Sequence, residues 1–286
     1  MSRRPRDMNV WHKVWQVDFY RRPLKDETNQ PLWELVVCDR TEESVRFAWC
    51  PQSSANSDWL VRQLPQMGDR LPDAFEFFRP ECESLLVAVG QRLGIRATAT
   101  RRTPLLKQVL QQRAREYPQM EGYSGDDYQP ISVYRPAPVP VPEDLQGDRW
   151  QFASLNAGDI DGFGSRPIPV RSIPESLRPF NLGLASTLPI PGVAIEGGRK
   201  SRSLTRWLQE IDPVSIQYIA GDPDGIVLEA GLVDRWVLET FKDEEVAAAA
   251  RTYQQRLQQS RGLHFLLVRP DDSGMTYSGF WLLQPA

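Results

Sequence analysis

Apolar and polar positions alternate over short stretches in the first third of the chain, which is typical of strands. Residues 14–20 and 33–38 have strand-like patterns, and a polar turn at residues 25–30 separates them. A third apolar run covers residues 74–78, and a fourth strand is expected over residues 95–99. The first third is therefore predicted to contain four strands.

Helices are predicted between and after these strands. A short helix is expected to begin with a cap at Ser57-Asp58, and residues 81–92 place apolar side chains on one helical face before Gly94. Another helix begins at Thr103-Pro104, with proline in its first turn. Strands that alternate with helices predict a mixed α/β layer.

The middle of the chain is rich in proline, with 12 of the 24 prolines between residues 118 and 191. Prolines alternate strictly over residues 134–142, which favours an extended polyproline conformation and excludes a central strand. Aromatic residues such as Trp150 and Phe180 are interspersed and would hold the segment against its neighbours. We therefore predict a packed linker over residues 121–185.

The last third returns to globular patterning. Ser201 or Ser203 is expected to cap a helix, and residues 214–220 and 226–230 are expected to pair across a glycine-rich turn. A third strand follows over residues 235–240, then a long helix with acidic residues at its start. Residues 263–268 and 276–283 predict a terminal hairpin.

These elements predict an α+β protein with two mixed α/β domains, residues 1–120 and 186–286, joined by the linker. A chain of 286 residues is long enough to bury two cores. Hydrophobic residues make up 41% and charged residues 25%, as in soluble globular proteins. Since no apolar run approaches the roughly 20 residues of a membrane span, no membrane insertion is expected.

The charge is unevenly distributed around a net value of -3. Residues 1–122 carry 19 Lys/Arg against 16 Asp/Glu, whereas residues 123–286 carry 15 against 21. All basic residues except five are arginine, which suits planar contacts with phosphates and bases, although codon bias would have the same effect. Cys38, Cys50 and Cys82 fit neither a disulfide framework nor a zinc site.

Known enzyme signatures are missing from the sequence. It contains no phosphate-binding glycine loop, nucleophile elbow or zinc-protease motif. We therefore expect no enzyme activity, no catalytic residues, no cofactor and no metal. The alternative is an unrecognised nuclease, which would gather Asp18, Glu34, Asp39 and Glu76 in one pocket.

The best candidate for ligand binding follows Gly197-Gly198. Two glycines that enter a helix N-terminus leave backbone amides able to face an anion. The basic residues that could surround an RNA phosphate here are Arg199, Lys200, Arg202 and Arg206. The alternative is a glycine turn and a serine cap beside a solvated basic face.

A second basic group lies at the ends of predicted strands, beside aromatic residues. Aromatic rings that stack on bases while arginines hold the backbone are typical of single-strand binding. The candidates in this group are Arg21, Arg22, Arg79, Arg101 and Arg102. The alternative is that the neighbouring rings, among them Trp15, Trp33, Phe75 and Phe77, belong to the core.

The last residues are unusually apolar for a chain end, with Trp281, Leu282 and Leu283 in sequence. Terminal residues are usually poorly ordered unless they are tied down. This functional motif is therefore either a docked final strand or an exposed site for a protein partner.

Several stretches of the chain resemble one protein family. They are residues 189–201, 225–236 and 279–283, with residues 33–39 and 78–80 in the amino-terminal half. They are similar to the Tab-two (Atab-two) family of RNA-binding proteins from oxygenic phototrophs. The terminal Trp-Leu-Leu at residues 281–283 is the most specific mark of this resemblance, which covers nearly the whole chain.

The resemblance implies binding to A/U-rich RNA near translation starts and promotion of the synthesis of a photosystem I reaction-centre subunit. Because no transit peptide is evident at the start, a cyanobacterial cytoplasmic protein is expected. Translation or photosystem assembly proteins are expected as further partners. The alternative function is an adaptor in photosystem assembly that binds proteins through the proline-rich segment and the terminal cluster, without RNA.

Overall fold

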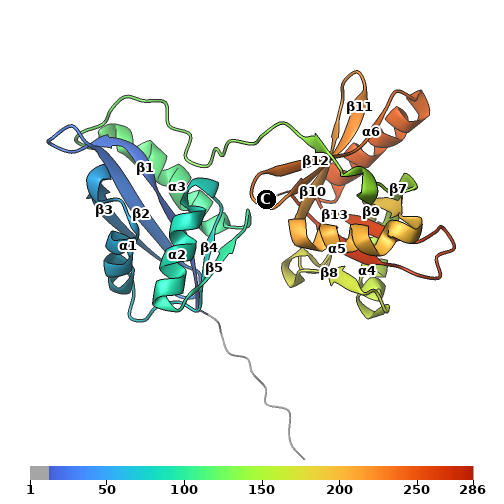
Figure 1. The fold of residues 1–286 in the computed structure, drawn as a ribbon, viewed down its shortest axis with the longest axis horizontal. Coiled ribbons are helices and arrows are strands. Elements are labelled where there is room, and N and C mark those ends of the chain that lie inside the picture. The colour runs from blue at the N-terminus through green and yellow to red at the C-terminus, as the bar shows by residue number, and fades with distance from the viewer. Residues whose placement is uncertain (1–12, 286) are drawn as a thin grey trace, which may run out of the picture. The chain divides into compact units, whose positions relative to one another are not determined.

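A computed structural model describes residues 13–285, which divide after Tyr134 into two compact units (Figure 1). Each unit has its own sheets and helices, so the mixed α/β character predicted from the sequence is confirmed. Residues 1–12, on which the expectation about a transit peptide rests, lie outside the described range. Within residues 13–285, no helix is long and apolar enough to cross a membrane.

The first unit contains a five-stranded sheet in the order β3-β2-β1-β4-β5. The strands β1 (Val14–Lys25), β2 (Pro31–Asp39) and β3 (Ser44–Pro51) are antiparallel, and β4 (Ala74–Phe77) and β5 (Arg96–Ala99) continue the sheet in parallel to β1. The four predicted strands are confirmed. The edge strand β3 was not predicted, because exposed, half-buried and buried residues follow one another along it without regular alternation.

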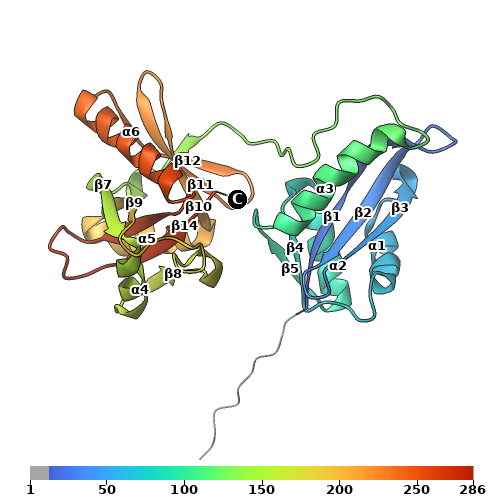
Figure 2. The ribbon, with the colours of Figure 1, turned by 180° about the vertical axis from the view of Figure 1, so that it is seen from behind.

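Helices α1 (Ser57–Gln63) and α2 (Glu83–Leu93) cover one face of this sheet, and α3 (Pro104–Glu116) covers the other (Figures 1 and 2). Alternation along β1 separates the two environments: Phe19 stacks on Trp59 of α1, whereas Gln16 accepts the Leu106 N–H of α3. The cap of α1 is Asn56, whose side chain accepts the Trp59 N–H at 3.0 Å, so the predicted cap at Ser57-Asp58 lies slightly too late.

The second unit is built on the sheet β7-β9-β13-β14-β8. Its strands are β7 (Arg149–Asn156), β8 (Val170–Ser172), β9 (Pro189–Glu196), β13 (His264–Arg269) and β14 (Gly279–Leu283). The predicted terminal hairpin is confirmed, because β13 and β14 pair antiparallel with Leu266 opposite Trp281.

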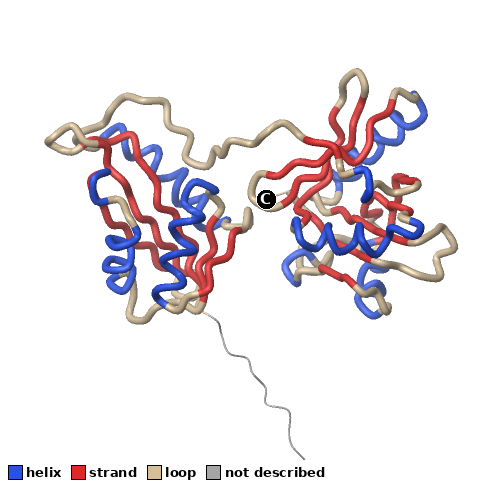
Figure 3. The backbone as a smooth tube through the Cα atoms, in the orientation of Figure 1, coloured by secondary structure: helices blue, strands red, loops and turns tan. Residues whose placement is uncertain are grey.

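A second sheet in this unit has the order β10-β11-β12-β6. The predicted hairpin strands are present as β10 (Pro213–Ile219), β11 (Asp224–Ala230) and β12 (Asp234–Phe241), and the short β6 (Val139–Pro140) pairs with β12. The tube in Figure 3 shows both sheets with the helices around them.

Helices α5 (Ser201–Ile211) and α6 (Glu244–Gln259) also follow the predicted pattern. The Asp243 side chain caps α6 by accepting the N–H groups of Glu245 and Val246. No serine caps α5, because its N-cap position is Lys200 and forms no side-chain cap bond. The predicted serine cap is therefore wrong.

The predicted linker over residues 121–185 is also wrong. From residue 139 onward it contains β6, β7, β8 and helix α4 (Ala157–Ser165), and β7 pairs with β9 along eight residues. The linker prediction relied on proline density, but these prolines lie between the elements or at their ends. The predicted carboxy-terminal domain, residues 186–286, thus lacks strands that belong to its own sheet.

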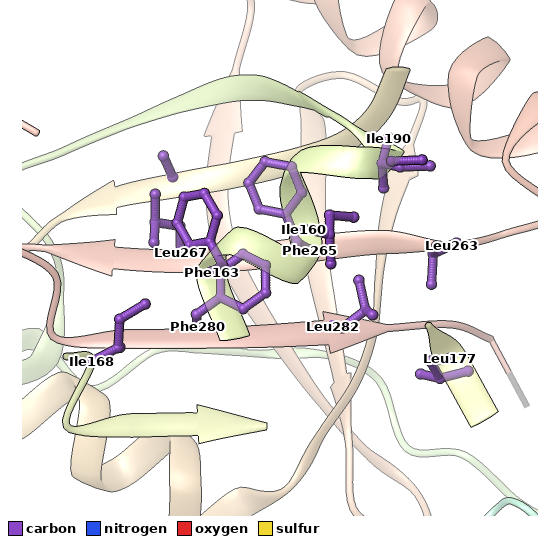
Figure 4. Close-up of a cluster of buried hydrophobic side chains, with 12 residues drawn as sticks. Ile160, Phe163, Ile168, Leu177, Ile190, Leu263, Phe265, Leu267, Phe280 and Leu282 are labelled. Carbon is purple, nitrogen blue, oxygen red and sulfur yellow. The ribbon is translucent and has the colours of Figure 1, made fainter. Parts of the chain in front are cut away.

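Both faces of the main sheet in the second unit are buried. On one face, Phe265 and Phe280 pack against Phe163 of α4, as the buried cluster in Figure 4 shows. On the other face, Leu266 and Trp281 join a cluster with Leu204 of α5. This burial explains why β13 and β14 read as continuous apolar runs.

Candidate nucleic-acid interface

An open hollow of about 790 Å³ lies beside α5 in the second unit. Its wall consists of α5, residues 166–170 before and at the start of β8, and the connection from β13 to β14. Arg202 and Arg206, two of the predicted RNA contacts, line this hollow and are exposed. A third exposed arginine, Arg166, joins them from the segment after α4. We call this site the α5 hollow.

The α5 hollow carries positive charge without compensating carboxylates. None of its lining residues is Asp or Glu, although Asp271 and Asp272 lie in the same connection outside the lining. Within residues 13–285, Arg166, Arg202 and Arg206 form no ion pair. Three cations that line one hollow, with no carboxylate in its lining, create a local positive potential that attracts anions.

The Arg166 guanidinium is held in place by aromatic rings. It lies 4.6 Å from the ring centroid of Phe163 and 5.2 Å from that of Tyr277, and its Nη1 donates to Tyr277 Oη at 2.9 Å. These contacts fix the planar group while leaving other N–H donors unused, because a guanidinium carries five. Arg166 is therefore preorganised at the rim of the hollow.

Thr205 also lines the α5 hollow, and its buried hydroxyl has no hydrogen-bond partner among residues 13–285. The Thr205 methyl lies toward Gly279 of β14, where an added Cβ would come within 2.9 Å of it. The glycine thus allows α5 to pack closely on the sheet.

The other two members of this predicted cluster have different positions. Arg199 is exposed but is not among the residues that line the hollow. Lys200 Nζ donates to the carbonyl oxygens of Glu143 and Gln146 at 3.3 and 3.5 Å. Lys200 therefore holds a neighbouring turn of the protein, and only part of its donor capacity remains.

The expectation that Gly197 and Gly198 leave amides for an anion is wrong. Their N–H groups donate to the carbonyl oxygens of Arg269 and Pro270 at 2.9 and 3.0 Å. Gly198 has a positive φ of 50°, and a Cβ on it would collide with the Asp148 carboxylate. The glycine pair is required for backbone geometry and close packing.

The second predicted basic group is largely buried in the first unit. Arg22 donates to Asp18 at 2.9 Å and to Glu34 at 3.0 Å, with all of these side chains inaccessible. Burial alone would lower the pKa of Arg22, but Asp18 and the surrounding groups raise it above its ordinary value. The prediction that Arg22 contacts RNA is wrong, because its charge is neutralised inside the fold.

Arg79 is likewise a structural residue. It donates to Asp18 at 2.9 Å and to the Pro130 carbonyl at 2.8 Å, and it stacks on Tyr20 with 4.1 Å to the ring centroid. Arg79 thereby holds the segment after α3 against the sheet, and its predicted RNA contact is wrong. The alternative that the neighbouring aromatic rings belong to the core is confirmed for Trp15, Phe75 and Phe77, which are fully buried.

The remaining arginines of this group differ in exposure. Arg101 is 5% exposed, so its predicted role at an RNA surface is wrong, and Arg102 is half-buried; both interact within the protein. Arg21 is exposed next to the buried Arg22, because successive side chains of β1 alternate between environments. Arg21 remains a candidate contact.

The carboxylates proposed for a nuclease interact with donors of the protein itself. Asp18 and Glu34 share Arg22, while Asp39 accepts the Trp15 indole N–H and pairs with Lys13. Glu76 accepts from Arg40 and Gln16. Across residues 13–285, no three His, Cys, Asp or Glu side chains are grouped to hold a metal ion. The geometry expected of a nuclease is not observed.

The terminal Trp281, Leu282 and Leu283 are buried in β14, between β13 and β8. Of the two alternatives for this motif, the docked strand is confirmed. An exposed partner site at these residues is wrong, because their side chains fill the two faces of the sheet. The adaptor hypothesis thereby loses one of its two contact surfaces.

Comparison with known families covers both units. Residues 14–113 match the amino-terminal domain of the RNA-binding protein Tab2/Atab2, and residues 128–284 match its carboxy-terminal domain. The chain belongs to the Tab2/Atab2 family of RNA-binding proteins. The resemblance inferred from the sequence is confirmed.

Two plant relatives extend the similarity. A chloroplastic TAB2 homolog of Arabidopsis thaliana is 28% identical over 282 residues, covering 95% of this chain and 74% of that protein. A chloroplastic TAB2 homolog of Zea mays is 27% identical over 281 residues, covering 95% of this chain and 71% of that protein. The similarity therefore extends through both units.

Two solved structures are distantly similar to parts of this chain. The catalytic core of the HTLV-2 integrase is 13% identical over 38% of this chain and 76% of that one, with a TM-score of 0.25. A simian T-cell lymphotropic virus intasome bound to a PP2A regulatory subunit is 14% identical over 50% of this chain and 65% of that one, with a TM-score of 0.26.

Sequence reasoning missed Arg166, Thr205 and Tyr277 as members of the site. Arg166 lies in the segment interpreted as a linker, and Tyr277 lies 111 residues further along the chain. Their contact follows from the pairing of β8 with β14, which brings both segments to the same edge of the sheet. Only the regular spacing of Arg202 and Arg206 on one helical face was visible in the sequence.

Proposed function

We propose that this protein binds the A/U-rich leader of an mRNA for a photosystem I reaction-centre subunit and promotes its translation. The α5 hollow is the proposed contact, with Arg166, Arg202 and Arg206 neutralising phosphates of the RNA. The exposed Arg199, in the turn before α5, is an additional proposed contact, and Arg21 is a further one on the first unit.

The observation that carries this proposal is the set of three arginines around a carboxylate-free hollow. They occur in the more acidic part of a chain with net charge -3, where the average field repels RNA. Affinity for RNA comes from locally clustered cations that release counterions, so a local cluster is sufficient for binding. Membership of an RNA-binding family supports the same ligand.

The first experiment is a binding titration with a labelled A/U-rich leader RNA at several salt concentrations, with a G/C-rich RNA of equal length as competitor. We expect salt-sensitive binding that favours the A/U-rich RNA. Equal affinity for both RNAs would contradict leader recognition, and the absence of binding at micromolar protein would contradict the RNA contact itself.

A triple variant tests the site. Replacing Arg166, Arg202 and Arg206 by alanine should reduce the slope of log K against log salt by about 2, because each phosphate contact on a single strand contributes about 0.7. The matched control replaces the exposed Arg62, Arg115 and Arg251. The control variant has the same net charge as the triple variant, so an equal loss of RNA affinity in both would place binding outside the α5 hollow.

The translational role needs its own test. A reporter mRNA carrying the A/U-rich leader should be translated more in an extract that contains the protein than in one without it, and the triple variant should lose this gain. Capture of photosystem assembly proteins that persists after ribonuclease treatment, together with an unchanged reporter, would favour the adaptor alternative instead.

A further inference from the structure

We infer that the α5 hollow accommodates one unpaired nucleotide, with its phosphate at the arginine rim and its base inside the hollow. This inference rests on the proposed RNA binding and specifies the form of RNA that the site accepts. It implies that the protein distinguishes single-stranded RNA from duplex RNA by shape, before any preference for sequence.

The size and shape of the hollow support an inserted group. Its volume of about 790 Å³ lies within the range of small-molecule sites, about 300 to 1,000 Å³, and a single nucleotide is a ligand of this class. A basic helix that only followed an RNA backbone would need no such depression. The arginines therefore mark the entrance of a concave site.

The lining of the hollow is chemically mixed, as base recognition requires. Apolar atoms come from Pro169, Val170 and Met275, which can contact the face of a base. Gln209 and Thr276 also line the hollow, and their exposed side chains supply amide and hydroxyl groups. Bases with exposed Watson–Crick edges can satisfy such groups, whereas phosphate alone cannot use the apolar surface.

The arginines occupy suitable positions for the backbone on either side of the inserted base. Arg202 and Arg206 are one helical turn apart on α5, so they project from the same face. Arg166 reaches the hollow from another element and is held by Phe163 and Tyr277. Cations on two different elements can therefore contact successive phosphates of one strand.

A duplex cannot use this arrangement. Bases in an A-form helix are paired and stacked, and their insertion would require unstacking that costs free energy. Duplex RNA would contact only the rim. The protein should therefore bind a single strand at least ten-fold more tightly than a duplex of the same sequence and length at the same salt concentration.

A variant that fills the hollow separates the contribution of base insertion from that of the arginine charges. Thr276 is exposed and lines the hollow, so Thr276→Phe fills the space while all three arginines remain. We expect this variant to lose the preference for single strands and to retain the duplex affinity. The control, Gln254→Phe, adds the same ring to the exposed face of α6 and should retain the preference.

Small probes test the base and the phosphate separately. Adenosine 5′-monophosphate or uridine 5′-monophosphate should compete with single-stranded RNA at least ten-fold better than ribose 5-phosphate, and Gln209→Leu should reduce this advantage. Equal competition by ribose 5-phosphate would overturn base insertion and leave a simple anion site.

Each failure has its own meaning. If wild-type protein binds single-stranded and duplex RNA equally, or if Thr276→Phe leaves the preference unchanged, the inference is overturned while RNA binding stands. If neither form of RNA binds, the proposed function itself fails. Circular dichroism of each variant confirms that the fold is retained before affinities are compared.

Discussion

The imidazole of His264 is fully buried and holds two strands of the second unit. Its Nε2 accepts the Ile216 N–H at 2.8 Å, and its Nδ1 is 2.8 Å from the Gly262 carbonyl, to which it donates. Burial lowers the pKa of His264 from 6.5 to about 4. The neutral ring is therefore required by the fold, since a protonated Nε2 would face another donor.

This geometry predicts a loss of stability in mild acid. The unfolded chain binds a proton at His264 below pH 6.5 and the folded one only below about pH 4, so stability falls as the pH drops through this window. Between pH 7 and pH 4.5 we expect protonation of His264 in the unfolded chain to lower the free energy of unfolding by about 2 to 3 kcal/mol. Urea unfolding of the wild-type protein and of His264→Gln at both pH values measures this loss of stability. An equal pH dependence in the two proteins would show that His264 is not its source.

Arg21 and Arg22 are neighbours in the sequence with opposite environments, which predicts opposite effects of substitution. Arg22→Ala removes one of the two arginines that pair with the buried Asp18 and one of the two that pair with the buried Glu34, and it should cost about 3 to 5 kcal/mol. Arg21→Ala should change stability by less than about 0.5 kcal/mol, because its side chain is exposed. Denaturant unfolding measures the free energy of unfolding of each variant, and similar losses in both variants would argue against the buried network around Arg22.

At the level of elements, β14 is an internal strand although it ends the chain. Trp281→Ala removes a ring that is 3% exposed and leaves a cavity between the sheet and α5, at a cost of about 3 to 5 kcal/mol. Phe180→Ala is the matched control, because that ring is 86% exposed, and its effect should stay near zero. Melting curves of the two variants that coincide with each other would refute a structural role of Trp281.

Helix α5 illustrates what an element-level pattern can and cannot predict. The spacing of Arg202 and Arg206 predicted that both lie on one basic face, and the structure buries Leu204 and Leu208 of the same helix. The sequence could not show that the N–H groups of Gly197 and Gly198 donate to the carbonyl oxygens of residues 269 and 270, because these hydrogen bonds depend on the pairing of β9 with β13. Local patterns determine a helix face, but distant strands determine what surrounds it.

At the scale of the whole molecule, the position of the boundary predicts which fragments fold. Residues 135–286 contain every strand of both carboxy-terminal sheets, whereas residues 186–286 lack β6, β7 and β8. The longer fragment should unfold cooperatively, and the shorter one should show no cooperative transition. Thermal unfolding followed by circular dichroism tests this, and a cooperative transition of residues 186–286 would restore the boundary predicted from proline density.

The sequence by itself determined the family, most strands and helices, the terminal hairpin and the basic face of α5, because these depend on local alternation and on short motifs. Tertiary structure alone decided which arginines are accessible. Arg22 and Arg79 pair with Asp18 inside the first unit, while Arg166, Arg202 and Arg206 meet around a hollow without carboxylates. The physical reason is that burial and charge compensation depend on partners distant in the chain, and residues of the same type therefore have opposite roles.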